Sequence, residues 1–209
     1  MSLFLGKIHY WLFNKIKWTE QLEDQIMIWA KSKDMDTDQL NKKLLEIGEP
    51  VGDVQLEDII DTSNIHGWLQ DKIIKAEARQ AEIVTFILKN DSSYMNELEN
   101  IFSQQGKEAA KVYAQNPDTP QDIYTAINDF ILEGMPCDRV SETLSSDENE
   151  YMWKNSRCLH EGHWQRANGD VSVFYSLRTS WIKSFVNEIN KNFSFEQLPQ
   201  NTYRIYNVS

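Results

Sequence analysis

Two cysteines and two histidines between residues 137 and 163 are the side chains whose types best suit a chemical site. They are Cys137, Cys158, His160 and His163. Thiolate and imidazole are ligands that zinc prefers, and four of them complete its tetrahedral coordination. Three of the four lie within six consecutive residues, and Cys137 would reach them from across the intervening segment. The composition therefore predicts a zinc site formed by these four residues.

The spacing of these residues differs from that of standard zinc motifs. There is no Cys-x2-Cys pair, and two residues separate His160 from His163, where structural sites usually have about three to five. A purely structural interpretation is therefore open. Cys137 would then be a small buried residue just after a helix, and the two histidines would lie on a surface loop anchored by Trp164.

A catalytic use of the thiol is a third interpretation. Cys158 would act as a nucleophile if His160 or His163 served as its base, and Arg157 or Arg166 would stabilise the thiolate. The sequence has no dinucleotide-binding, P-loop, Gly-x-Ser-x-Gly or His-Glu-x-x-His motif, so it indicates no other known chemistry and no nucleotide cofactor.

Helices must position these residues, because the spacing of apolar residues is helical along most of the chain. The longest helix is predicted over about 63–90, where apolar residues recur every three or four positions. Gln80 falls within this apolar seam, beside Glu77 and Arg79, and buried polar residues there would fix the packing register or line a pocket. We predict that this helix is the central helix of a bundle.

Two further helices have clear sequence signals. Thr119, Pro120 and Asp122 match the first positions of a helix over 119–133, since threonine caps helices and proline suits the first turn. Apolar spacing also predicts a helix over 171–189. Apolar and polar residues alternate at its start, however, so a β-hairpin there is an alternative.

Shorter elements are predicted elsewhere in the chain. The N-terminal part shows one helix before Thr19, a second that Thr19 would cap, and a third that ends at Gly48. Residues 134–170 are polar and are predicted to form an irregular loop. Side chains of different polarity alternate along residues 201–206, and this pattern favours a short strand or an extended arm.

These elements predict a mainly α fold, namely a multi-helix bundle around one long central helix. A Cys/His-containing loop and a short C-terminal strand or hairpin would complete it. We predict one domain over residues 1–209, with a helical bundle at 1–133, the Cys/His loop at 134–170, and the C-terminal helix and tail at 171–209. A chain of 209 residues is long enough to bury a sizeable core without disulfides or metals.

The charge distribution limits the class of partner. The net charge is −11, and because residues 1–18 carry three lysines and no acidic residue, the remaining 191 residues carry −14. Such an acidic body repels phosphate backbones, so we expect no nucleic-acid partner. No apolar run reaches the length of about 18 residues that would suggest a membrane helix, and no signal peptide is indicated. Two cysteines suit a reducing compartment, so we expect a cytoplasmic protein that does not bind membranes.

Three functional hypotheses follow from these observations. The first is a cytoplasmic helical protein that binds a small molecule or a protein, with zinc in the 137–163 loop. The second is an enzyme that uses a Cys/His pair in a pocket between that loop and the helices. The third is a structural protein that forms a homodimer through its N-terminal helix, where Trp11 lies.

Overall fold

The computed structural model describes residues 5–209 and shows a mainly α protein with a small β-sheet. The helices are α1 (Lys7–Ser32), α2 (Asp38–Ile47), α3 (Leu56–Ile59), α4 (Ile65–Asn90), α5 (Met95–Val112), α6 (Pro120–Asn128), α7 (Glu161–Arg166) and α8 (Val171–Ile189). The strands are β1 (Ser141–Ser146), β2 (Glu150–Asn155), β3 (Phe193–Leu198) and β4 (Thr202–Asn207). Short 3-10 turns lie at Ser92–Tyr94 and Pro136–Asp138.

The chain folds into two compact units. The first comprises Met1–Ser92, Phe130–Met135 and His160–Asp170, and the second comprises Ser93–Asp129, Pro136–Leu159 and Val171–Ser209. A bundle around one central helix is not confirmed, because each unit has its own set of elements. That the two units form the single domain expected over 1–209 stays a prediction.

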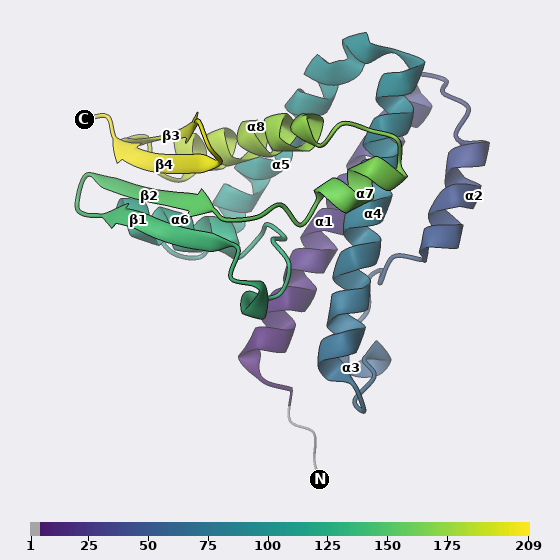
Figure 1. The fold of residues 1–209 in the computed structure, drawn as a ribbon, viewed down its shortest axis with the longest axis horizontal. Coiled ribbons are helices and arrows are strands. Elements are labelled where there is room, and N and C mark those ends of the chain that lie inside the picture. The colour runs from purple at the N-terminus through teal and green to yellow at the C-terminus, as the bar shows by residue number, and fades with distance from the viewer. Residues whose placement is uncertain (1–4) are drawn as a thin grey trace. The chain divides into compact units, whose positions relative to one another are not determined.

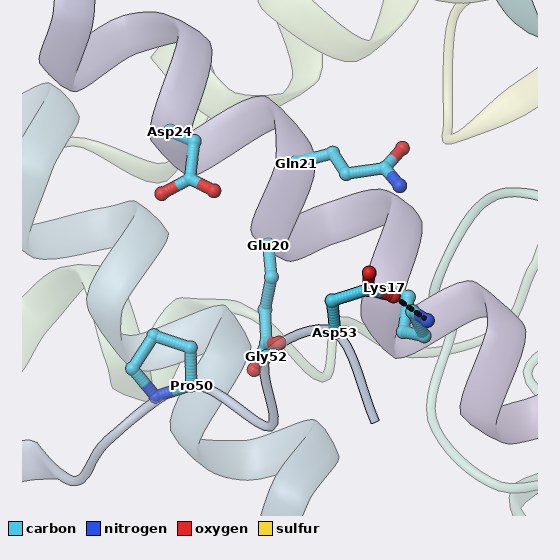
Figure 2. Close-up of a pocket in the computed structure, with 7 residues that line it drawn as sticks. All are labelled: Lys17, Glu20, Gln21, Asp24, Pro50, Gly52 and Asp53. Atoms are coloured by element: carbon cyan, nitrogen blue, oxygen red, sulfur yellow. Dashed lines mark hydrogen bonds and ion pairs between the residues drawn. The ribbon is translucent and has the colours of Figure 1, made fainter. Parts of the chain in front are cut away.

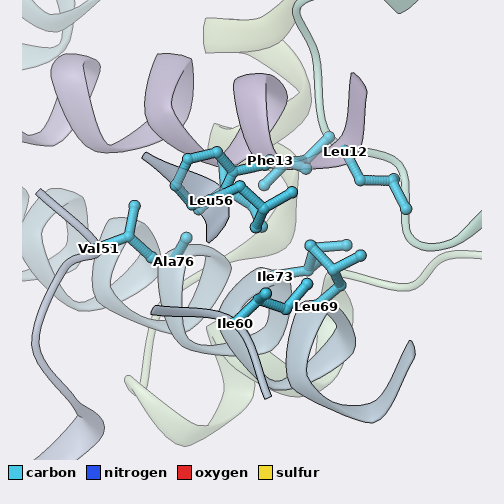
Figure 3. Close-up of a cluster of buried hydrophobic side chains, with 10 residues drawn as sticks. Leu12, Phe13, Val51, Leu56, Ile60, Leu69, Ile73 and Ala76 are labelled. Atoms are coloured by element: carbon cyan, nitrogen blue, oxygen red, sulfur yellow. The ribbon is translucent and has the colours of Figure 1, made fainter. Parts of the chain in front are cut away.

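The core of the first unit lies between α1 and α4, which run side by side (Figure 1). Leu12 and Phe13 of α1 lie opposite Leu69 and Ile73 of α4, and Leu56 of α3 fills the space between them (Figure 3). All five side chains are buried. Burying a side chain of this kind stabilises the fold by about 1.5–3 kcal/mol, so the apolar seam predicted over 63–90 does form a core.

The predicted break at Thr19 is wrong, because α1 is one continuous helix. The hydroxyl of Thr19 donates to the carbonyl oxygen of Lys15 at 3.1 Å, a bond that threonine forms within helices. The apolar stripe stays in phase across this position, since Leu12 and Ile16 before it and Ile26 after it are all buried. The burial of these apolar residues therefore favours a continuous helix at Thr19, although threonine also suits a helix cap.

The second unit combines helices with an antiparallel sheet of strand order β1-β2-β4-β3. Helices α5 and α8 pack against each other, and α6 contacts β2 and β4. The ring of Tyr124 in α6 lies with its centroid 4.5 Å from that of Tyr151 and 4.7 Å from that of Trp153. Aromatic residues thus join the helical layer to the buried face of the sheet.

Residues 134–170 are not the irregular loop that was predicted, because they contain β1, β2 and α7. Tyr151 and Trp153 of β2 are buried and alternate with less buried neighbours, which is the period-two signal of a half-buried strand. The carboxylate of Asp147 accepts hydrogen bonds from the backbone N–H groups two and three residues further on, at 2.8 and 2.9 Å. These hydrogen bonds to Asp147 form the turn between β1 and β2.

Helix α6 begins as predicted but ends earlier. The hydroxyl of Thr119 accepts a hydrogen bond from the N–H of Asp122 at 3.1 Å. The helix stops at Asn128 rather than at residue 133. The chain then enters the first unit, where the ring of Phe130 packs edge-on against Trp18 with centroids 5.0 Å apart.

Residues 171–189 form helix α8, as predicted, so the hairpin alternative at their start is wrong. The alternating residues 201–206 lie in and beside β4, which pairs with both β3 and β2. None of the helices in residues 5–209 is both long and apolar enough to cross a membrane.

Gly106 lies where α5 meets α8, and this close contact yields a stability prediction. A Cβ atom at Gly106 would lie 2.3 Å from the backbone oxygen of Trp181. We expect Gly106→Ala to lower the free energy of unfolding by about 1–3 kcal/mol through overpacking, although alanine normally stabilises a helix interior by about 0.5–1 kcal/mol. Urea unfolding followed by circular dichroism measures the difference.

Gly162→Ala in α7 is the matched control. Its Cβ would meet only the end of the Arg166 side chain, at 3.6 Å, so we expect no loss of stability. A Gly106→Ala variant as stable as the wild type would show that the two helices do not need this close approach.

Candidate functional site

The two cysteines of the predicted zinc site lie in the second unit. Cys137 is exposed, which contradicts the alternative that it is a buried small residue. Cys158 is half-buried, and the hydroxyl of Tyr175 donates a hydrogen bond to its sulfur at 3.0 Å. Both thiols are free rather than joined in a disulfide.

The two histidines lie in the first unit and are buried, so the alternative that they are surface residues is wrong. His160 is 2% exposed and His163 is 7% exposed. The carboxylate of Glu77 lies between them, with Oε1 3.5 Å from Nδ1 of His160 and Oε2 3.5 Å from Nε2 of His163. Nε2 of His160 lies 3.3 Å from Oε1 of Glu133. We call Glu77, Glu133, His160 and His163 the His/Glu cluster.

The protonation of His163 follows from its partners. Nη2 of Arg166 lies 2.9 Å from Nδ1 of His163, and because a guanidinium group only donates, Nδ1 must accept. The proton of the neutral ring is therefore on Nε2, which faces Glu77. Burial, together with electrostatic repulsion from Arg166 and His160, lowers the pKa of His163 to about 4. His163 is thus neutral at physiological pH.

The zinc site predicted at Cys137, Cys158, His160 and His163 is not confirmed by this geometry. Within residues 5–209, no three His, Cys, Asp or Glu side chains are grouped so that they could hold a metal ion. Both ring nitrogens of His163 already face partners, and a metal would have to displace one of them. The zinc site therefore stays a prediction from the sequence.

A second buried polar group centres on Arg79 of α4, which is 2% exposed. Its Nε donates to Glu23 at 2.8 Å, its Nη2 donates to Glu20 at 2.7 Å, and its Nη1 donates to the carbonyl of Gly48 at 2.9 Å. Both oxygens of the Glu20 carboxylate also accept from the N–H of Val51, each at 3.0 Å. We call Glu20, Glu23 and Arg79 the Arg79 network.

In this network the single guanidinium of Arg79 donates hydrogen bonds to two carboxyl groups, those of Glu20 and Glu23. Burial raises the pKa of Glu23 to about 8; Arg79 opposes this rise, while the negative charges of Glu20 and Asp24 add to it. The rise prevails because a single cation cannot compensate two buried carboxylates and a third nearby. Glu23 therefore holds a proton near neutral pH.

Two cavities lie over the Arg79 network, and we call them together the α1 groove. The first has a volume of about 290 Å³ and is shown in Figure 2, where the Lys17–Asp53 ion pair of 3.2 Å crosses it from α1 to the α2–α3 linker. The second has a volume of about 360 Å³. Asp24 and Pro50 line both cavities.

The two cavities have different linings. The first is lined by Lys17, Glu20, Gln21, Asp24, Pro50, Gly52 and Asp53. The second is lined by Glu23, Asp24, Met27, Lys31, Asn41, Leu44, Leu45, Gly48, Glu49, Pro50, Arg79 and Ile83. The second cavity thus adds apolar side chains to the charged ones.

Sequence reasoning found only part of this site. It singled out Glu77 and Arg79 as polar residues beside the apolar seam of the long helix, but it missed Glu20 and Glu23. These two acids lie within the apolar stripe of α1, which also contains Ile16. Acids in the apolar stripe of one helix, together with an arginine in that of another, are the signal that predicts such a buried pair.

No family model matches the chain, and no curated protein and no solved structure matches it either. The geometry of the two buried polar groups and of the groove is therefore what bears on function.

The neutral state of His163 yields a pH prediction. Because the folded protein disfavours protonation of His163 until pH about 4, whereas the unfolded chain binds this proton at pH about 6.5, its contribution to stability is complete above pH about 6.5. That contribution is lost as the pH falls from about 6.5 toward 4, with a slope of at most about 1.4 kcal/mol per pH unit. Urea unfolding at a series of pH values measures this slope.

His163→Gln is the comparison variant, because glutamine keeps a donor and an acceptor but does not titrate. We expect a shallower fall in its stability between pH 6.5 and 4 than in the wild type, with carboxylates contributing equally to both. Parallel pH profiles would show that His163 is not held neutral.

The zinc hypothesis has its own test, which is elemental analysis of untagged protein purified without chelators. The hypothesis predicts about one equivalent of zinc and its loss in Cys158→Ser. Protein that carries no zinc and has two titratable thiols would remove the hypothesis.

Proposed function

We propose that the protein binds a small organic molecule in the α1 groove. The observation that carries the proposal is the second cavity, which joins apolar residues such as Met27, Leu44 and Ile83 to the buried carboxyl group of Glu23 and the buried guanidinium of Arg79. Its volume of about 360 Å³ lies in the range of about 300–1,000 Å³ that is typical of ligand sites. Mostly apolar walls with a few well-placed polar groups are also typical of such sites.

The polar groups of the groove are held in place before any ligand arrives. Arg79 is held by two carboxylates and by a backbone carbonyl, and Glu20 is held in addition by a backbone N–H. A ligand that contacts them does not have to order flexible side chains, which lowers the entropy cost of binding. This preorganisation favours a binding site over an incidental surface hollow.

The proposal retains the first hypothesis from the sequence in a coarser form, as a binding protein. A cytoplasmic location fits the two free thiols. The hydroxyl of Tyr175 donates a hydrogen bond to the sulfur of Cys158, and the enzyme hypothesis stays a prediction from the sequence.

A fragment screen tests the proposal. We expect some compounds in a mixed set of cationic, neutral and anionic fragments to raise the melting temperature of the protein, because a ligand that binds the folded state stabilises it. Met27 is a partly buried residue of α1 that lines the second cavity, so Met27→Trp should fill the cavity and remove these shifts. Differential scanning fluorimetry measures them.

Ile74→Trp is the control for added bulk, because Ile74 is 45% exposed on α4 and lines neither cavity. It should leave the shifts unchanged. The proposal fails if no fragment stabilises the wild type, or if Met27→Trp and Ile74→Trp respond alike.

A further inference from the structure

The charges that line the α1 groove are unevenly balanced. Asp24 and Glu49 line the second cavity, and within the described residues neither has a hydrogen bond or ion pair to a cation. Glu23 adds a third carboxyl group, which it shares with Arg79. Lys31 is the remaining cation of this cavity, and it is exposed in the last turn of α1. Asp24 and Glu49, both exposed, thus add negative charge to this cavity that no ion pair within the described residues offsets.

The Arg79 network intensifies this imbalance. Its guanidinium is within 2.8 Å of both Glu20 and Glu23, so its single positive charge is already shared. The negative charge of Asp24 also acts on Glu23. Arg79 thus has two carboxyl partners, and Asp24 adds a negative charge near one of them, so a further positive charge placed beside Asp24 would be stabilised.

We infer that the ligand of the α1 groove is a small alkylammonium compound, with its ammonium group beside Asp24 and Glu23 and its aliphatic stem on Met27 and Leu44. The inference rests on the proposed function, since it names the class of ligand for the same cavity. An ammonium group suits the site because it is compact and donates three hydrogen bonds to carboxylates. The stem suits the apolar wall, where its burial contributes about 0.8 kcal/mol for each methylene.

An anionic ligand fits this cavity poorly. It would bring a negative charge close to Asp24 and Glu49, and like charges at short distance repel. Arg79 offers little compensation, because Glu20, Glu23 and Gly48 already accept hydrogen bonds from it. The chemistry of the cavity therefore selects a cation.

Cation binding should be coupled to proton release. Glu23 holds a proton below pH about 8, and an ammonium group beside it favours the ionised carboxylate, so binding expels that proton. Affinity should therefore rise with pH up to about pH 8 and level off above it. The ligand stays charged throughout, because alkylammonium groups, like lysine, lose their proton only at about pH 10.4.

The test compares three probes that have the same stem and different charge. Hexylammonium, hexan-1-ol and hexanoate are titrated into the ¹⁵N-labelled full chain, and amide chemical shifts give the affinities. We expect hexylammonium to bind with shifts at α1 and at residues 48–53, hexan-1-ol to bind more weakly, and hexanoate to bind least. Hexanoate or hexan-1-ol binding as tightly as hexylammonium would overturn the inference.

Two variants locate the charge, and a third serves as the control. Asp24→Asn should weaken hexylammonium binding by about fivefold or more, which corresponds to one charge pair at about 4 Å in water. Glu23→Gln should remove the rise in affinity between pH 6.5 and 8. Glu46→Gln, an equal charge change at an exposed position of α2 that lines neither cavity, should change neither quantity. Equal effects of Asp24→Asn and Glu46→Gln would overturn the inference, because only the net charge would then matter.

These outcomes separate the inference from the proposed function. The proposed function fails if no probe or fragment of any charge binds in a way that Met27→Trp abolishes. The inference alone fails if neutral or anionic compounds bind in the groove and hexylammonium does not.

Discussion

The buried guanidinium of Arg79 is the constraint on which the first unit depends. A charge that is 2% exposed must have partners, and removing one partner of a buried ion pair costs about 3–5 kcal/mol. Its three partners come from two elements: Glu20 and Glu23 lie on α1, and the carbonyl of Gly48 lies at the end of α2. Two long helices and a linker must therefore meet at one point, and the apolar core of Leu12 and Leu69 packs around the arrangement that results.

The α1 groove forms where α1, α4 and the linker after α2 come together at Arg79. Glu20 binds the N–H of Val51 and so holds the α2–α3 linker above α1. The linker leaves α2 at Gly48, whose φ of +134° is open to glycine and strained for other residues. The linker is also held by Val51, whose side chain joins the apolar core, while charged side chains line the space between the linker and α1.

Helix α4 carries both buried polar groups, and its geometry keeps them apart. Glu77 and Arg79 are two residues apart, which places them about 200° apart around the helix axis. Glu77 faces the histidines at α7, whereas Arg79 faces the acids of α1. A long helix with polar residues on two faces and an apolar seam between them can join elements on both sides. Each polar residue can stay buried because side chains of the neighbouring element satisfy its hydrogen bonds.

The sequence by itself determined the elements whose signals are local. The seam of α4, the cap at Thr119 and the helix at 171–189 depend on residues within a few positions of each other, so spacing and capping rules predict them. Only the tertiary structure decided which buried charges pair. Arg79 and Glu23 lie 56 positions apart, and His160 and Glu133 lie 27 positions apart. Such pairings form because burial leaves each charge or ring no water to bind, and periodicity carries no information about which distant residue will replace that water.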